Sequence, residues 1–233
     1  MTAPLVELVD VTKVYGRGDT EVRALAGASL EIAEGEFLAV MGPSGSGKST
    51  CLNVIGCLDR PTAGAQYFRG VELGKLSGDQ LALFRRNYLG FVFQGYNLLA
   101  RTSAIENVEL PLVYRGVNRG ERHQRAQQAL VDVGLAGREH HTPSELSGGQ
   151  QQRVAIARAI VTGPSVLLAD EPTGNLDSVR KDEIMLLLRN LNATRGITVI
   201  MVTHEPEMAA YAHRTVHFRD GVIDRVEVRS LPS

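Results

Sequence analysis

The sequence has few residues that could cross-link the chain or bind soft metals: only two cysteines, Cys51 and Cys57, occur among its 233 residues. They are six positions apart in what reads as one helix, which places them on different faces. No nearby histidine completes a set of metal ligands. We therefore expect two reduced, buried thiols and no redox or metal role. Reduced thiols agree with a cytoplasmic chain.

Long apolar runs are also missing. The longest uncharged apolar stretches, such as 197–202, fall far below the roughly 18 residues needed to span a bilayer. Residues 1–7 show no basic region followed by an apolar stretch, so we expect no signal peptide. Any membrane role is then expected to depend on a partner chain.

Neither sign of charge dominates. With 25 basic and 26 acidic residues the formal net charge is -1, and the two signs are mixed along the chain. This balance argues against an electrostatic nucleic-acid surface, and we expect no nucleic-acid partner. The hydrophobic content of 43% is sufficient for a sizeable core. No internal repeat occurs, which indicates a single functional unit.

Apolar periodicity predicts alternating strands and helices. The expected strands are 5–14, 22–32, 36–41, 66–73, 89–93, 166–169 and 197–203. The expected helices are 48–58, 81–86, 151–161, a stripe at 184–191 that ends at Gly196, and 207–212, with a terminal hairpin turning at Asp220-Gly221. From about 95 to 160 the rhythm is helical, which indicates a helical subdomain. Strand–helix–strand order elsewhere implies a parallel core sheet and an α/β fold.

A glycine-rich loop between an expected strand and an expected helix matches G-x-x-x-x-G-K-S in full. Its residues are Gly42, Pro43, Ser44, Gly45, Ser46, Gly47, Lys48 and Ser49. Glycines let successive N–H groups surround phosphate oxygens, and the helix N-terminus adds partial positive charge. We expect Lys48 to reach the β- and γ-phosphates of ATP, Ser49 to bind Mg²⁺ and Thr50 to contact the α-phosphate. The alternative, a fortuitous turn, occurs in about 1% of chains of this length.

Two adjacent carboxylates, Asp170 and Glu171, end the apolar strand 166–169, where parallel strands line a ligand crevice. Alternation sends them in different directions, so we assign Asp170 to Mg²⁺ and Glu171 to the attacking water. His204 ends the next buried strand and could contact the γ-phosphate at the same edge. The alternatives are a solvated strand end and a structural histidine.

A second glycine motif opens the helix 151–161: Leu146 is followed by Ser147, Gly148, Gly149 and Gln150. The simplest interpretation is a capping box between Ser147 and Gln150. A capping box does not explain why two glycines occupy the first turn of the helix, since glycine weakens a helix. Close approach of the backbone to an anion would explain them. The phosphate loop already binds the γ-phosphate of the one nucleotide held by its chain. The second site should therefore bind the nucleotide held by another chain. That predicts a head-to-tail homodimer.

These motifs together resemble the nucleotide-binding domain of ATP-binding cassette (ABC) transporters, whose hallmark is this LSGGQ signature shortly before an acidic strand end. The resemblance covers almost the entire chain. It implies a P-loop NTPase core with a mainly parallel sheet, an N-terminal antiparallel β subdomain and an inserted α-helical subdomain. The corresponding division is a core of 1–94 and 161–233 and a helical subdomain of 95–160. It also implies that two domains sandwich two ATP molecules between one phosphate loop and the other signature.

The resemblance gives roles to residues that are weak signals alone. Tyr15 resembles the aromatic residue that stacks on adenine, although by itself it is an ordinary strand-end aromatic. Gln94 resembles the glutamine that joins Mg²⁺ to the helical subdomain and takes part in hydrolysis, and its alternative role is to cap a strand. The segment 174–177 resembles the loop that crosses the dimer interface. The segment 95–100 resembles part of the groove for a permease helix, or else packs the subdomain core.

Within the family, the segments 11–25, 55–59, 93–98 and 170–177 look like the bacterial lipoprotein-release and macrolide-export group, which is LolD- and MacB-like. That resemblance implies a separate membrane permease with a periplasmic domain, with a periplasmic adaptor as a further candidate partner. The chain would then be cytoplasmic and held at the inner face of the membrane. Two alternatives stay open: a signalling module acting on a membrane partner without transport, and a soluble ABC ATPase of DNA repair or translation.

Overall fold

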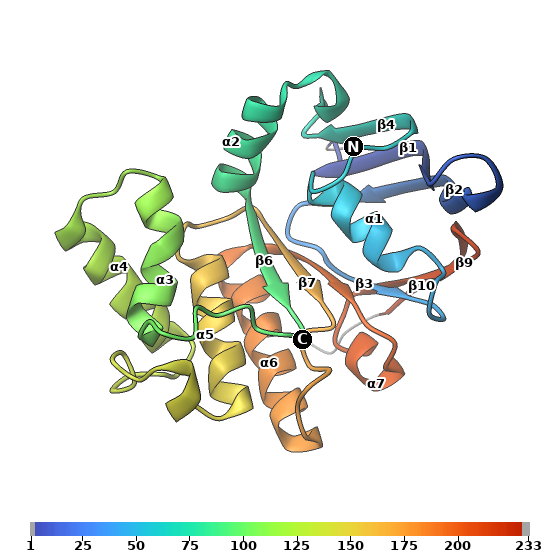
Figure 1. The fold of residues 1–233 in the computed structure, drawn as a ribbon. Helices are drawn as coiled ribbons and strands as arrows, with labels where there is room; N and C mark the ends of the chain where they lie inside the picture. The colour runs from blue at the N-terminus through green and yellow to red at the C-terminus, as the bar shows by residue number, and fades with distance from the viewer. Residues whose placement is uncertain (1–2, 230–233) are drawn as a thin grey trace.

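The computed structural model describes residues 3–229 of the chain (Figure 1). Residues 1–2 and 230–233 lie outside the described residues. The first two belong to the segment in which no signal peptide is expected, and the last four belong to the expected core. Among the described helices none is both long and apolar enough to cross a membrane.

Two sheets form the fold. The larger has six strands in the order β10-β9-β3-β8-β7-β6, and the smaller has four in the order β2-β1-β4-β5. The strands of the larger sheet are β3 (Phe37–Met41), β6 (Leu89–Phe93), β7 (Val166–Asp170), β8 (Thr198–Val202), β9 (Arg214–Arg219) and β10 (Val222–Val228). All its pairs are parallel except that of β9 and β10. The smaller, antiparallel sheet contains β1 (Val6–Tyr15), β2 (Val22–Ile32), β4 (Ala63–Phe68) and β5 (Val71–Glu72).

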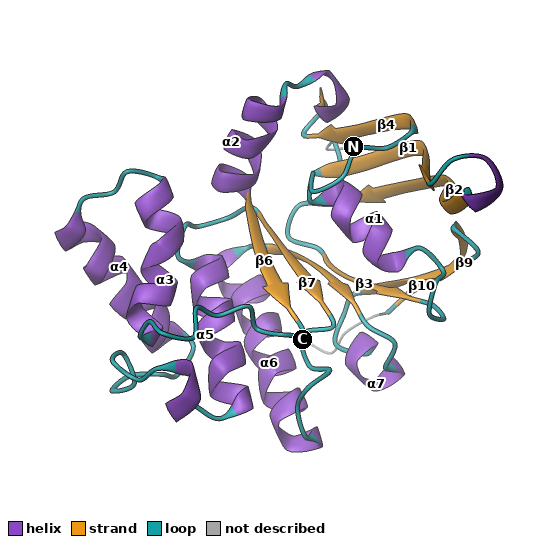
Figure 2. Ribbon diagram, viewed as in Figure 1, coloured by secondary structure: helices purple, strands orange, loops and turns teal. Residues whose placement is uncertain are grey.

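The helices lie around these two sheets (Figure 2). They are α1 (Lys48–Ile55), α2 (Gly78–Tyr88), α3 (Ala104–Tyr114), α4 (Arg119–Asp132), α5 (Gly148–Ile160), α6 (Ser178–Arg195) and α7 (Pro206–Ala209). Short 3-10 helices cover Gly18–Thr20, Leu73–Lys75 and Pro143–Glu145. Helix α1 lies between the two sheets, α5 and α6 cover the opposite face of the larger sheet, and α3 and α4 stand away from the smaller sheet.

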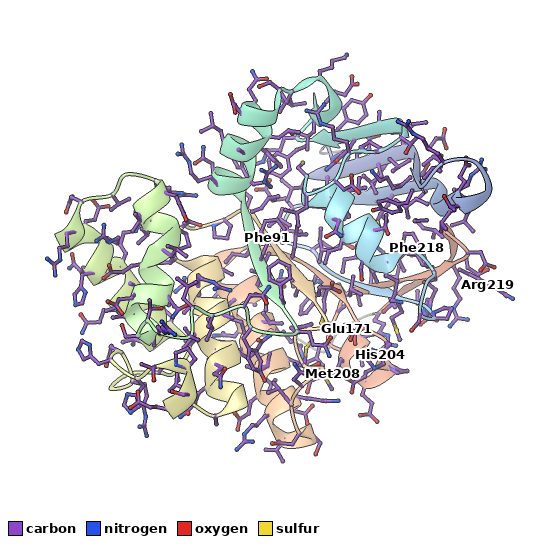
Figure 3. All side chains as sticks on the ribbon, in the orientation of Figure 1. Phe91, Glu171, His204, Met208, Phe218 and Arg219 are labelled. Atoms are coloured by element: carbon purple, nitrogen blue, oxygen red, sulfur yellow. The ribbon has the colours of Figure 1, made fainter. Side chains whose placement is uncertain are left out.

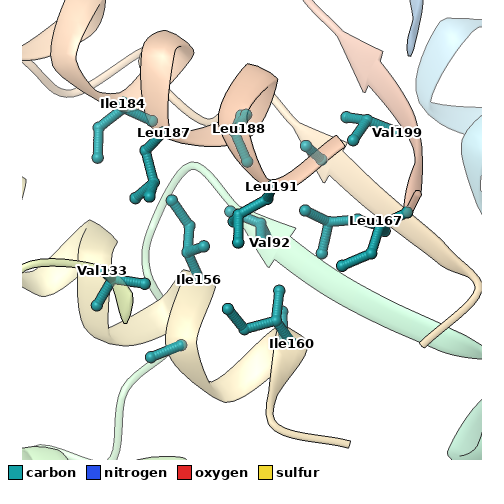
Figure 4. Close-up of a cluster of buried hydrophobic side chains, with 14 of the residues drawn as sticks. Val92, Val133, Ile156, Ile160, Leu167, Ile184, Leu187, Leu188, Leu191 and Val199 are labelled. Carbon is teal, nitrogen blue, oxygen red and sulfur yellow. The ribbon is translucent and has the colours of Figure 1, made fainter. Parts of the chain in front are cut away.

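The strands of the larger sheet divide their side chains between two cores. Phe37 and Ala39 face the cluster that includes α5 and α6, while Leu38 and Val40 face the cluster that includes α1 and the antiparallel sheet. Figure 4 shows part of the first cluster, which includes Ile156 and Ile160 of α5 together with Leu188 of α6. Burial on both faces explains the continuous apolar runs in these strands. The mainly parallel core and the N-terminal antiparallel sheet are confirmed.

Local predictions differ from the structure in a few places. The strand expected at 66–73 is split, because Arg69 and Gly70 have positive φ angles of 47° and 78° and form a turn. The prediction that both cysteines share a helix is wrong, since α1 ends at Ile55 and Cys57 has a φ of 52°. Both thiols are nevertheless free and buried. The helix expected at 207–212 is shorter and ends at Ala209.

Candidate functional site

The phosphate loop connects β3 to α1 in a backbone conformation that depends on glycine. Gly42 and Gly47 have φ angles of 148° and 100°. A Cβ atom at Gly42 would stand 2.2 Å from the Phe218 carbonyl oxygen of β9, and one at Gly47 would stand 2.3 Å from the Ala24 carbonyl oxygen of β2. The loop is therefore held between two strands from opposite ends of the chain, and side chains at these positions would push it out of place.

Lys48 begins α1 and its side chain is buried inside this loop. Its Nζ donates a hydrogen bond of 2.8 Å to the carbonyl oxygen of Pro43. Burial lowers the pKa of the ammonium group, and the charges of Glu171 and Asp170 oppose that shift. The hydroxyl of Ser46 is also buried and has no hydrogen-bond partner among the described residues. Both groups are suited to phosphate oxygens.

Asp170 is the last residue of β7 and faces the start of α1. Its Oδ1 lies 3.5 Å from Oγ of Ser49. Burial raises the pKa of Asp170 and the charge of Glu171 raises it further, while the hydrogen bond from Ser49 and the charge of Lys48 oppose the shift. A carboxylate beside a hydroxyl is a donor set that suits Mg²⁺, which binds few protein oxygens and completes its shell with phosphate and water. Residues 3–229 contain no group of three His, Cys, Asp or Glu arranged to hold a metal ion, so such a cation would need those other oxygens.

Glu171 and His204 come together at the carboxyl edge of the sheet (Figure 3). The Nδ1 atom of His204 lies 3.0 Å from Oε1 of Glu171. Both line a crevice of about 610 Å³ with Gly42, Pro43 and Ser44 of the phosphate loop. A carboxylate and an imidazole beside a phosphate-binding loop can orient and activate water. The structure thus brings together the three segments that the sequence singled out separately.

Gln94 follows β6 and is bonded to the segment 174–177. Its Nε2 donates to Oδ1 of Asn175 at 3.3 Å, and Nδ2 of Asn175 donates to the Gln94 carbonyl oxygen at 3.0 Å. A Cβ atom at Gly174 would stand 2.7 Å from Gln94 Nε2, so the glycine allows this close approach. Asn175 was expected only as part of an interface loop. Its bond to Gln94 had no signal in the local sequence.

Tyr15 ends β1 beside α1. Its hydroxyl donates to Oδ2 of Asp59 at 2.7 Å, and Nζ of Lys13 lies 4.9 Å from the ring centroid. Burial raises the pKa of the phenol and Asp59 adds to the shift, whereas a hydrogen bond with Thr50 opposes it. The residue is 41% exposed, so part of its surface is free to contact a ligand. Lys13 and Asp59 were not predicted, because only the fold brings them to Tyr15.

The signature residues lie in a different hollow. The capping box is present, with Gln150 N–H donating to Ser147 Oγ at 3.4 Å and Ser147 N–H donating to Gln150 Oε1 at 2.9 Å. A Cβ atom at Gly148 would stand 2.9 Å from the Tyr96 hydroxyl, and one at Gly149 would stand 3.0 Å from Cδ of Arg180. Packing within the chain therefore also accounts for these glycines, which the sequence attributed to an anion alone.

That hollow has a volume of about 330 Å³, and Ser147, Gly149 and Gln150 line it together with Arg153 and Arg180. It shares no lining residue with the crevice of the phosphate loop. The signature is therefore not part of the crevice that contains Glu171.

The sequence profile of ABC transporters matches residues 25–174. This chain belongs to the ABC transporter family. The cassette is 55% identical over 223 residues to the macrolide export ATP-binding/permease protein MacB of Hyphomonas neptunium. This match covers 96% of this chain and 34% of that protein. It is 51% identical over 227 residues to an uncharacterized ABC transporter ATP-binding protein of Thermotoga maritima, which covers 97% of each chain.

Among solved structures, the ABC cassette is similar to the ATP-binding cassette MJ0796, captured as a dimer in a post-hydrolysis state bound to ADP and Pi. The TM-score is 0.87 and the identity is 46%, over 97% of this chain and 100% of that one. The cassette spans about a third of the length of the MacB relative, 34%. The ABC ATPase fold, its ATP-binding and ATP-hydrolysing class, and the MacB-like group are confirmed. The subdomain boundaries and the roles of individual site residues stay predictions.

Proposed function

We propose that two copies of this cassette close head to tail on two ATP molecules, each bound between the phosphate loop of one copy and the signature of the other. The observation that carries the proposal is the separation of the two half-sites within one chain. A phosphate loop and a capped, glycine-bearing helix start both suit anions. A head-to-tail pair with two-fold symmetry would join each loop to one signature.

Within each composite site we assign the phosphates to the backbone of 42–47 and to Lys48, with Thr50 as a further contact. Ser49, Asp170 and Gln94 supply the oxygen ligands for Mg²⁺, which would neutralise charge on the phosphates when bound. Tyr15 stacks on the adenine ring. Ser147, Gly148, Gly149 and Gln150 face the nucleotide of the partner copy.

Hydrolysis is assigned to Glu171 and His204. Glu171 polarises the attacking water. His204 orients the Glu171 carboxylate through the 3.0 Å contact and lines the same crevice, where it would contact the γ-phosphate. Gln94 directly follows β6, and its amide is bonded to the segment 174–177 that is proposed to meet the partner copy. Closing the dimer would exclude water from this site and so strengthen its electrostatic interactions.

We further propose a membrane permease as the partner, which places the cassette at the cytoplasmic face of the membrane. Support comes from a groove of about 560 Å³ formed by β6 with α2, α3 and α5, lined by Phe91, Phe93, Asn97, Tyr114 and Arg158 among others. It is mostly apolar and includes part of the segment 95–100. The MacB relative carries both ATP-binding and permease parts in its name. Export of a small molecule is the activity that the name of this relative favours. Release of a lipoprotein is a further candidate activity, and a periplasmic adaptor is a further candidate partner.

The substitution Glu171→Gln tests the proposal. It keeps the size of the side chain and removes the charge that polarises water, so we expect kcat to fall about a hundredfold or more. Binding of MgATP should stay within about twofold of wild type. The variant should accumulate as an ATP-dependent dimer on size-exclusion chromatography, because the closed state can no longer hydrolyse its nucleotide.

The substitution Glu139→Gln, on the turn after α4, is the matched control and should hydrolyse ATP normally. Glutamine keeps an oxygen that can accept the 2.9 Å hydrogen bond from the Gly137 N–H. Hydrolysis by Glu171→Gln at the wild-type rate would remove Glu171 from its role. A Glu171→Gln protein that stays monomeric with MgATP would contradict the composite site.

A further inference from the structure

Two polar links join the first turns of α6 to the segment that follows His204. Lys181 Nζ forms an ion pair with Oε2 of Glu205, and the Tyr211 hydroxyl donates to Oδ1 of Asp182 at 2.9 Å. The side chains of Lys181 and Glu205 are only 21% and 23% exposed. Solvent and salt therefore screen this pair less than an ordinary surface pair.

The Glu205 end of the pair is adjacent to the proposed catalytic histidine. The backbone N–H of Glu205 donates to Oγ1 of Thr203 at 3.1 Å, and the Glu205 carbonyl oxygen accepts from the N–H of Ala209 at 3.1 Å. His204 lies between these anchored residues, and its ring is 60% exposed. The position of the imidazole against Glu171 is thus set mainly by the backbone on either side of it.

The Lys181 end leads to the segment 174–177. Asp177 caps α6, with Oδ1 accepting from Arg180 N–H at 3.0 Å and its carbonyl oxygen accepting from Lys181 N–H at 2.9 Å. The same segment is bonded to Gln94 through Asn175. One continuous series of contacts therefore runs from 174–177 through Lys181 and Glu205 to His204.

We propose that Lys181 and Glu205 are positioning residues for hydrolysis, and that their ion pair transmits the position of the segment 174–177 to His204. This inference rests on the proposed function, because it needs Glu171 and His204 to act on water and 174–177 to meet the partner copy. A displacement of about 1 Å in a reacting group can cost about a hundredfold in rate. An intact pair would therefore affect kcat far more than the binding of ATP.

The test compares two charge-removing single variants and one charge-reversed double variant of the full chain, with MgATP as the probe. Lys181→Met keeps most of the side-chain stem and removes the charge, and Glu205→Gln removes the partner charge. Each should lower kcat about tenfold or more and leave the Kd for ATP within about twofold. The reversed pair, Lys181→Glu with Glu205→Lys, should recover most of kcat, because the ion pair forms again with opposite polarity.

Arg195→Met is the matched control, since Arg195 pairs with Asp132 at the opposite end of α6. It should leave kcat unchanged. Wild-type kcat in Lys181→Met would overturn the inference alone. The single variants could instead lose kcat, ATP binding and Tm to the same extent, with no recovery in the reversed pair. That result would show a merely structural role and would also overturn the inference. A wild-type protein that fails to hydrolyse ATP would overturn the proposed function and this inference with it.

Discussion

Glu171 has a left-handed backbone conformation, with a φ of 45°, directly after the last residue of β7. Such a conformation costs on the order of 1 kcal/mol outside glycine. It is held by two backbone hydrogen bonds, from Glu171 N–H to the Val202 carbonyl oxygen at 3.0 Å and from Gly174 N–H to the Glu171 carbonyl oxygen at 3.1 Å. The turn directs the Glu171 carboxylate to His204 while Asp170 faces Ser49. The sequence predicted diverging carboxylates from strand alternation, whereas β7 ends at Asp170 and Glu171 already lies in the turn beyond it.

Residue-scale chemistry also predicts the reactivity of the thiols. Burial raises the pKa of Cys51 to about 12 and that of Cys57 to about 11. We expect neither to react with iodoacetamide in the folded protein at about pH 8, because the thiolate is the reactive form. Mass spectrometry should show two labelled cysteines after denaturation and none before it. Ser144→Cys, at an exposed position, should label in the folded state.

The sign of the accompanying pH effect follows from the same shifts. The unfolded chain loses its thiol protons near the ordinary value of 9.0, before the folded chain does. The stability contributed by the buried thiols is complete below that pH and is lost as the pH rises toward 11 to 12. Rapid labelling of the folded protein at about pH 8 would contradict their burial.

At the scale of elements, the hairpin of β9 and β10 contacts the backbone of the phosphate loop at two points. The N–H of Gly221, in the hairpin turn, donates to the Ser46 carbonyl oxygen at 3.1 Å, and the Gly221 carbonyl oxygen accepts from Ala26 N–H at 2.9 Å. The Phe218 carbonyl oxygen of β9 faces Gly42. The sequence predicted the hairpin from Asp220-Gly221, but it contained no sign that this turn would contact a loop about 175 residues earlier.

Gly42→Ala tests this support. The added Cβ would meet the Phe218 carbonyl oxygen at 2.2 Å in a backbone conformation with a φ of 148°. We expect the loop to move and the Kd for MgATP, measured by calorimetry, to rise about tenfold or more, since several backbone N–H groups lose their alignment. In Gly78→Ala the Cβ would meet nothing within 4 Å, so this control should bind ATP normally. Equal affinities in the two variants would contradict the proposed role of the contact.

At the scale of the whole molecule, the phosphate loop and the signature line separate hollows of one chain, which are the two halves of the proposed composite site. The phosphate loop is framed by both sheets, whereas the signature lies at the start of α5 in the helical region. Closure of the composite site would therefore depend on how two complete chains dock. The MJ0796 cassette, of the same fold, was captured as a dimer with ADP and Pi.

Ser147→Arg tests dependence on the second copy. The bulky side chain should block the hollow that faces the partner nucleotide and leave the phosphate loop of its own chain intact. We expect MgATP binding within about twofold of wild type and hydrolysis lowered about a hundredfold. Ser144→Arg, three positions away and exposed, is the control. Full hydrolysis by Ser147→Arg would leave the capping box as the sole role of the signature.

The sequence by itself determined the α/β class, the parallel core, the phosphate loop, the acidic strand end and the capped signature helix. These features depend on short-range periodicity and on motifs whose residues are adjacent in the chain. The sequence patterns did not predict the turn at Arg69 or the end of α1 before Cys57. Both involve non-glycine residues with positive φ, which no residue type marks in the local sequence.

Only the tertiary structure decided which distant residues meet. The contacts of Tyr15 with Asp59, of Gln94 with Asn175 and of Lys181 with Glu205 join segments that are 44, 81 and 24 residues apart. Nothing in local periodicity specifies such pairs, since they follow from how the strands order in the sheets and how the helices pack on them. The same packing put the signature and the phosphate loop in different hollows, and so made the second copy part of the proposed site.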